Sequence, residues 1–103
     1  MRVTSELWVS ALIRRAFSSG GFAAVLRRGS AEAGAIFVVA RGRMGDASLY
    51  GPAPQADYDE RRPADRLFRR IEENADAEAI DRRIERETRF DPDLWLVEVE
   101  PER

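Results

Sequence analysis

Ala35-Ile36-Phe37-Val38-Val39-Ala40 is the longest apolar run in the chain, and it is rich in β-branched and aromatic side chains. Gly34 precedes this run, and Arg41-Gly42 follows it. A short apolar run between turn residues is typical of a strand that is buried on both faces of a sheet. A helix fits the pattern too, but six residues would be short for one. The run therefore predicts a central strand.

Two further strands are predicted close to the central one. Residues 22–28 are expected to form a strand, with Phe22, Ala24 and Leu26 on one side. Residues 41–46 contain two glycines that can adopt positive φ, so a hairpin connection is expected there. Residues 47–51 would return beside the central strand. Residues 22–51 are thus predicted to form a three-stranded meander.

Helices are predicted near both ends of the chain. The first helix runs from Glu6 to Ser18, with Thr4 or Ser5 as its N-cap. Its apolar side chains cover most of the cylinder, so it should pack under a sheet or a second subunit. The second helix is mostly charged, and it is expected to run from its cap at Asp76 to about Arg89.

Residues 66–72 fit either a helix or an edge strand by the spacing of their apolar side chains, and we favour the strand. Residues 94–100 are predicted to be the last strand, with Glu98 and Glu100 facing solvent.

The order α-β-β-β-(β)-α-β predicts an α+β fold in a single domain over residues 1–103. We expect a mainly antiparallel sheet of four to five strands, with both helices on one face.

The residue types that are missing restrict the possible chemistry. All 17 basic residues are Arg, and the chain has no Lys, His or Cys. Without these residues there is no thiolate, no imidazole proton shuttle and no amine for a Schiff base. We therefore expect no cofactor and a non-catalytic protein.

No signal peptide is apparent, and no run approaches the roughly 20 apolar residues of a membrane span. A cytoplasmic protein is expected.

The first candidate binding site is the loop from Leu49 to Gln55. Prolines stiffen this loop and lower the entropy cost of binding, and an aromatic side chain can anchor a partner. Its candidate contact residues are Tyr50, Pro52, Pro54 and Gln55. The structural alternative is a strand that ends in a rigid turn.

A second contact surface would form if the core leaves part of the first helix uncovered, at Trp8, Leu12, Ile13 and Phe17.

Asp91 and Asp93 are candidates for a metal site or for an acid–base pair. Two carboxylates at this spacing could hold Mg²⁺ or Ca²⁺ if other oxygens converged on them, but the sequence supplies no further ligands. The structural alternative, which we favour, is that both residues form the turn between the second helix and the last strand. No metal site is therefore predicted.

Charge is distributed unevenly between the two halves of the chain. Residues 1–51 carry seven Arg against three acidic residues, a net charge of +4. Residues 52–103 carry ten Arg against sixteen acidic residues, a net charge of −6. A phosphate-binding cluster would form if four arginines share one edge of the sheet, namely Arg27, Arg28, Arg41 and Arg43. The sequence pI near 5.2 argues against general nucleic-acid binding.

Three stretches carry a resemblance to a known family: Ser5-Glu6-Leu7-Trp8-Val9-Ser10-Ala11, Leu49-Tyr50-Gly51-Pro52-Ala53-Pro54-Gln55 and Arg89-Phe90-Asp91-Pro92-Asp93-Leu94-Trp95. They resemble the domain of unknown function 1491 family, short proteins of alphaproteobacteria. The resemblance spans nearly the whole chain, and it implies a cytoplasmic bacterial protein that forms a complete domain. It assigns no role to any residue, because it implies no established activity.

Together these observations predict a small protein-interaction module whose partner is another protein or a second copy of the chain. The alternative is an anion- or nucleic-acid-binding domain that uses the arginine-rich first half. A third hypothesis is a hydrolase that uses Asp91 and Asp93 as its carboxylates.

Overall fold

The computed structural model describes residues 3–54 and 66–100, so Gln55 lies outside the described residues. Within this part of the chain there are two helices and five strands, in the predicted order. Their bounds are α1 (Ser5–Ser18), β1 (Phe22–Arg27), β2 (Ile36–Arg41), β3 (Ala47–Pro52), β4 (Phe68–Ala75), α2 (Ala77–Phe90) and β5 (Trp95–Glu100). The predicted α+β class is confirmed, and the ambiguous segment after residue 66 is a strand.

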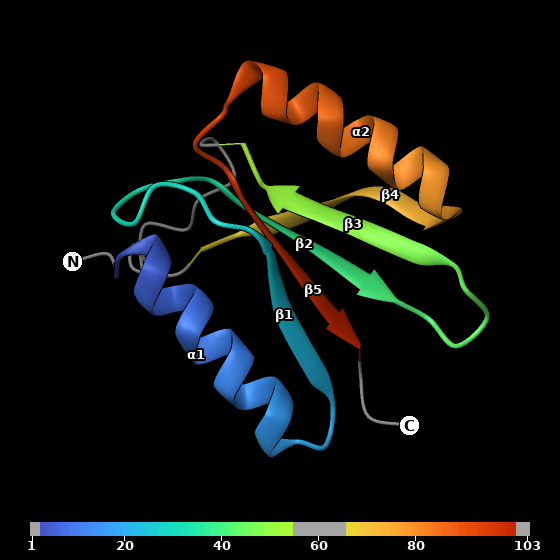
Figure 1. Ribbon diagram of the computed structural model, residues 1–103, viewed down its shortest axis with the longest axis horizontal. Helices are drawn as coiled ribbons and strands as arrows, with labels where there is room; N and C mark the ends of the chain where they lie inside the picture. The colour runs from blue at the N-terminus through green and yellow to red at the C-terminus, as the bar shows by residue number, and fades with distance from the viewer. Residues whose placement is uncertain (1–2, 55–65, 101–103) are drawn as a thin grey trace.

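The five strands form one sheet in the order β1-β5-β2-β3-β4, so β2 is the central strand, as predicted (Figure 1). β5 is parallel to β2, and the other neighbouring pairs are antiparallel. The predicted meander of residues 22–51 is wrong in its first strand. β1 does not pair with β2, because β5 lies between them and carries apolar side chains that fit a central position.

The two helices pack on opposite faces of the sheet, so the prediction that both lie on one face is wrong. On one face Val9 of α1 packs with Ile36, Trp95 and Val97. On the other face Ile80 of α2 packs with side chains of the central strands, including Phe37, Val39, Leu49 and Leu96. The physical reason is that β2 and the first half of β5 are apolar on both faces, and each face needs cover.

The first turn of α1 is fixed to the connection between β1 and β2. Thr4 is the N-cap, and its hydroxyl accepts a hydrogen bond from the amide of Leu7 (3.2 Å). Ser5 is fully buried, and its hydroxyl donates to the carbonyl of Gly34 (2.6 Å). The amides of Ser5 and Glu6 donate to the carbonyls of Glu32 and Ala31, both at 3.0 Å. The free amides at this helix end are thereby satisfied.

The connection between β1 and β2 also crosses the start of β5 in close contact. The indole of Trp95 donates to the carbonyl of Ser30 (2.7 Å), and its backbone amide donates to the carbonyl of Ala35 (2.7 Å). The amide of Ser30 donates to the carbonyl of Asp93 (2.9 Å). Gly29 and Gly34 lie so close to Asp93 that neither position has room for a Cβ atom.

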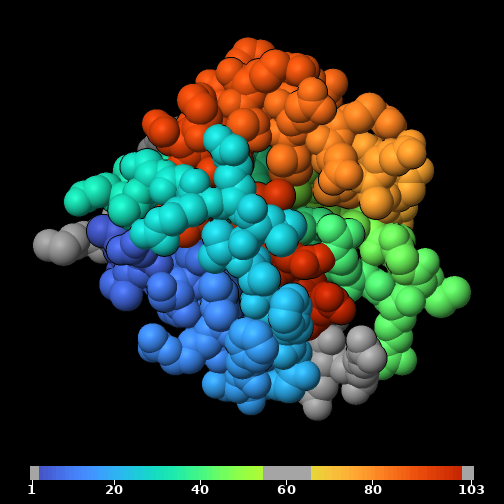
Figure 2. Space-filling model, viewed as in Figure 1, coloured from blue at the N-terminus to red at the C-terminus, as the bar shows by residue number. Residues whose placement is uncertain are grey.

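α1 lies across β1 and β5, whereas α2 lies across β3 and β4. β1 is therefore an edge strand that α2 does not cover. In the space-filling view β1 lies at the front, between α1 and the remaining strands, with no helix in front of it (Figure 2). Neither α1 nor α2, the helices of the described residues, has the length and apolar character that a membrane span needs.

Glu98 differs from its predicted solvent-facing position. Its side chain is only 16% exposed, and it forms an ion pair with Arg41. The two residues lie on the neighbouring strands β5 and β2, on the face that α2 covers only in part. A carboxylate on an inner strand of the sheet needs a partner of opposite charge when its exposure is this low.

We expect Gly29→Ala to lower the free energy of unfolding by about 3 kcal/mol or more, because the added Cβ would overlap the backbone of Asp93 and Leu94. Chemical denaturation measures this change. The matched control is Gly45→Ala in the β2–β3 hairpin, where φ is +86° and no atom lies within 4 Å of the added Cβ. That change should cost only about 1 kcal/mol of backbone strain. Equal losses at the two positions would contradict the close crossing.

Candidate functional site

Trp8 and Pro52, two of the predicted binding residues, lie next to the start of β4. Pro52 is exposed at the end of β3, and it pairs with Phe68 of β4. The ring of Trp8 is half-buried against the ring of Phe68, with 5.2 Å between their centroids. Tyr50 is half-buried within β3, and Pro54 is exposed. Phe68, which packs against Trp8, was not among the residues of the predicted site.

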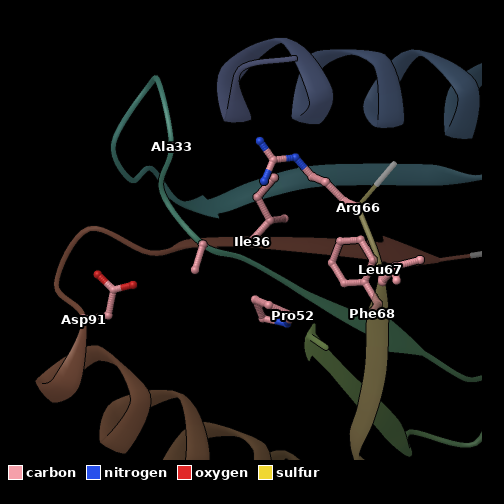
Figure 3. A pocket seen from close by; sticks show the side chains of 8 residues that line it. Ala33, Ile36, Pro52, Arg66, Leu67, Phe68 and Asp91 are labelled. Atoms are coloured by element: carbon pink, nitrogen blue, oxygen red, sulfur yellow. The ribbon is translucent and has the colours of Figure 1, made fainter. Parts of the chain in front are cut away.

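A cavity of about 230 Å³ lies beside these residues, between the start of β2, the end of β3 and the start of β4 (Figure 3). Ile36, Pro52 and Phe68 form apolar walls. The guanidinium of Arg66 points toward the start of α1, where it donates to the carbonyl of Val3 (3.0 Å) and the hydroxyl of Ser5 (3.3 Å). Arg66 therefore helps to hold α1 against β4.

Asp91 also lines this cavity, at the side away from Arg66 (Figure 3). One carboxylate oxygen of Asp91 accepts a hydrogen bond from the amide of Asp93 (3.1 Å), and its carbonyl accepts from the amide of Leu94 (3.3 Å). This geometry is an Asx turn, which matches the structural alternative for these two residues. Among the described residues no group of three or more His, Cys, Asp or Glu side chains is arranged to hold a metal ion.

The four arginines of the predicted phosphate-binding cluster do not share one edge, so that expectation is wrong. Arg27 and Arg28 lie at the end of the sheet where β5 begins, whereas Arg41 ends β2. Arg41 is about four residues, or roughly 13 Å, further along the sheet. Arg43 follows in the exposed β2–β3 hairpin. The antiparallel direction of β1 relative to β2 separates the two pairs.

Three of these arginines are engaged within the chain. Arg27 donates to the carbonyl of Pro92 (2.7 Å), and Arg41 pairs with Glu98. Arg28 pairs with Glu6 of α1, and its guanidinium carbon lies 5.0 Å from the ring centroid of Trp95. Anion binding by this set would have to compete with these contacts.

Exposed apolar side chains lie at the end of α1 and along β1, at the edge of the sheet. We call Phe17, Phe22, Val25 and Leu26 the edge patch. Phe17, Phe22 and Leu26 are 54%, 42% and 49% exposed, and Val25 is exposed as well. The rings of Phe17 and Phe22 pack edge to face, with 5.7 Å between their centroids. Of the residual helix surface predicted from the sequence, Phe17 is exposed, whereas Trp8, Leu12 and Ile13 are half-buried against the sheet.

Phe22 and Leu26 were not among the exposed apolar residues expected from the sequence. The uncharged run from Phe22 to Leu26 was the available signal, since it is more apolar than an exposed edge strand normally is. Its exposure depends on the pairing of β1 with β5, which lies far away in the sequence.

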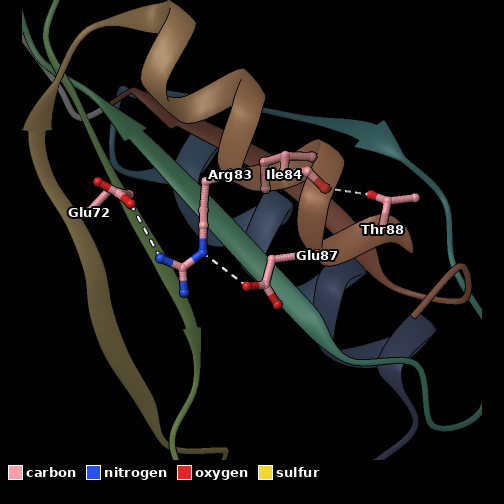
Figure 4. Close-up of polar contacts among 5 residues, drawn as sticks. All are labelled: Glu72, Arg83, Ile84, Glu87 and Thr88. Carbon is pink, nitrogen blue, oxygen red and sulfur yellow. Dashed lines mark hydrogen bonds and ion pairs between the residues drawn. The ribbon is translucent and has the colours of Figure 1, made fainter. Parts of the chain in front are cut away.

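The opposite edge of the sheet, β4, is polar and well connected. Four of its eight residues are charged: Arg69, Arg70, Glu72 and Glu73. Arg83 of α2 donates to Glu72 (3.3 Å) and to Glu87 (2.9 Å), which ties the helix to this edge (Figure 4). The pairing of β4 with β3 is irregular at two points, and Asn74 has a positive φ of 48°. Charges and bulges are common devices that prevent an edge strand from pairing with another chain.

The Glu72–Arg83 contact should contribute about 0.5–1 kcal/mol of coupling free energy, because both side chains are less than one-third exposed. A double-mutant cycle with Glu72→Gln and Arg83→Met measures it by chemical denaturation. The control cycle uses Glu78→Gln and Arg82→Met, since that pair spans 3.8 Å and is largely exposed. The coupling free energy of this control pair should be smaller. A control value as large as that of Glu72 and Arg83 would contradict the prediction.

If Asp91 is a turn residue, Asp91→Ala should lower the free energy of unfolding by about 1 kcal/mol, because the amide of Asp93 loses its acceptor. Asp91→Asn keeps an oxygen acceptor and should cost less. Thermal melting with and without millimolar Mg²⁺ or Ca²⁺ tests the competing metal hypothesis. A rise in melting temperature with either ion that Asp91→Asn abolishes would contradict the structural role.

Three solved structures are similar to this chain over almost all of its length. A solution structure of a protein from Agrobacterium tumefaciens shares 50% identity with a TM-score of 0.86, over 100% of this chain and 89% of that one. A crystal structure of a DUF1491 family protein from Caulobacter crescentus shares 38% identity with a TM-score of 0.79, over 97% of this chain and 87% of that one. An NMR structure of a DUF1491 family protein from the same organism has 38% identity and a TM-score of 0.80, covering 99% and 88% of the two chains.

No curated protein matches the sequence. The family model described as protein of unknown function (DUF1491) matches residues 3–103. The resemblance noted in the sequence is thereby confirmed, and this chain belongs to the DUF1491 family.

Proposed function

We propose that the protein is a non-catalytic interaction module and that the edge patch together with β1 is its contact surface. The observation that carries this proposal is the difference between the two sheet edges. β4 is charged and irregular, whereas β1, which α1 covers on one face only, presents exposed apolar side chains along its edge.

An edge strand has a row of backbone amides and carbonyls with no partner strand on its outer side. An added strand from a partner can pair with these groups, while side chains beside the edge provide apolar contacts. Phe22 and its packing partner Phe17 suit this role, because aromatic side chains are enriched at interfaces. β1 thus offers both backbone and side-chain contacts.

The chemistry of the chain supports a binding role over a catalytic one. The sequence contains no Lys, His or Cys. The carboxylate of Asp91, one of the two acids of the hydrolase hypothesis, accepts a hydrogen bond from the backbone amide of Asp93 in an Asx turn. A cytoplasmic location stays a prediction from the sequence.

We expect Phe22→Lys to abolish partner binding, since it places a charge in the edge patch. The fold should tolerate this change because Phe22 is exposed and pairs with Glu100 of β5, which suits a lysine. Affinity capture from the native bacterium, compared by quantitative mass spectrometry, should show the proteins retained by the wild type reduced at least about tenfold with the variant.

The matched control is Met44→Lys, the same kind of apolar-to-lysine change at a residue that is 91% exposed in the β2–β3 hairpin. This control should retain the wild-type partners. Identical sets of retained proteins from all three chains would mean that the edge patch is not the contact surface.

A further inference from the structure

We infer that the partner of β1 is a second copy of this chain, with the two β1 strands paired antiparallel about a two-fold axis at Ala24. This inference rests on the proposed function, because it names the partner of the same surface. The first argument is self-complementarity. Antiparallel pairing centred on Ala24 places Phe22 of one copy opposite Leu26 of the other. Both residues are exposed and apolar, and no charged residue lies between them in the sequence.

The edge patch has members on both sides of the proposed axis. Phe17 and Phe22 are in contact beyond one side of Ala24, and Val25 and Leu26 follow on the other side. A two-fold axis brings Phe22 of each copy against Leu26 of the other, so this apolar contact forms twice.

The charges that follow β1 favour the antiparallel direction. Arg27 and Arg28 come directly after Leu26. In an antiparallel pair the arginines of the two copies lie at opposite ends of the joint ladder, whereas a parallel pair would place them side by side. Glu100 pairs with Phe22 within each copy, so the arginines of one copy lie at the same end as Glu100 of the other.

The contact is short, so the dimer should be reversible. The register of β1 shifts between Val25 and Arg27, which confines regular backbone pairing to residues 23–25 of each copy and leaves Phe22 and Leu26 to meet through their side chains. Stable protein interfaces bury about 1,200–2,000 Å² in total, and a strand pair of this length with four apolar side chains lies at the low end. A concentration-dependent equilibrium between monomer and dimer is therefore expected.

Sedimentation equilibrium of the full chain tests this equilibrium. The dissociation constant should rise at least about tenfold in Phe22→Lys and in Leu26→Lys, and it should stay within about twofold of the wild type in Met44→Lys. Circular dichroism identifies any variant that fails to fold. If only one of Phe22→Lys and Leu26→Lys folds, that variant alone is compared with the wild type. A chain that stays monomeric up to millimolar concentration, or a dimer that both lysine changes leave intact, would overturn the inference.

Disulfide crosslinking tests the position of the axis, because the chain has no cysteine of its own. In the proposed pair, residue 24 of one copy lies directly opposite residue 24 of the other. Directly opposed residues of an antiparallel pair are close enough for a disulfide bond between them. Ala24→Cys should form a crosslinked dimer under mild oxidation at least about tenfold faster than Met44→Cys, which is on an exposed hairpin. Equal rates would overturn the proposed register.

The outcomes also separate this inference from the proposed function. A monomeric chain whose captured partners are lost in Phe22→Lys would overturn self-pairing and keep β1 as the contact surface. A dimer that forms through another surface, together with unchanged captured partners, would overturn both.

Discussion

The structure depends on the parallel pairing of β2 with β5, which brings the last strand of the chain between two strands formed much earlier. This pairing requires the β1–β2 connection to cross the start of β5 at close range. Gly29 and Gly34 allow the backbones to approach, and Trp95 holds the crossing through two hydrogen bonds from its side chain and amide. Without this crossing β5 could not reach the central strand.

Insertion of β5 determines what lies on each side of the sheet. It creates two adjacent inner strands that are apolar on both faces, so one helix has to cover each face. α1 covers the β1–β5 side and α2 covers the β3–β4 side. The same insertion leaves β1 as an edge strand whose outer side is open. The edge patch is thus a consequence of strand order rather than of unusual local structure.

Local sequence signals were sufficient to predict the elements but not their arrangement. N-cap residues identified the starts of both helices, and alternation correctly favoured a strand after residue 66. The sequence also favoured a turn at Asp91 and Asp93, and the structure has an Asx turn there. Strand order was missed, because no local pattern shows that β5 pairs with β2 across about 58 residues of chain. The misplaced second helix follows from that omission, whereas the separation of the arginines follows from the antiparallel direction of β1 and β2, which the predicted meander shared.

An apolar edge strand is hazardous if it can add copies without limit, so the two edges need to be considered together. Pairing through β1 about a two-fold axis would use the apolar edge of both copies at once. The outer edges of the joint sheet would then both be β4, where charges, an irregular ladder and the contact with Arg83 oppose further pairing. The asymmetry between the edges therefore favours an assembly that stops at two chains over one that grows into fibres.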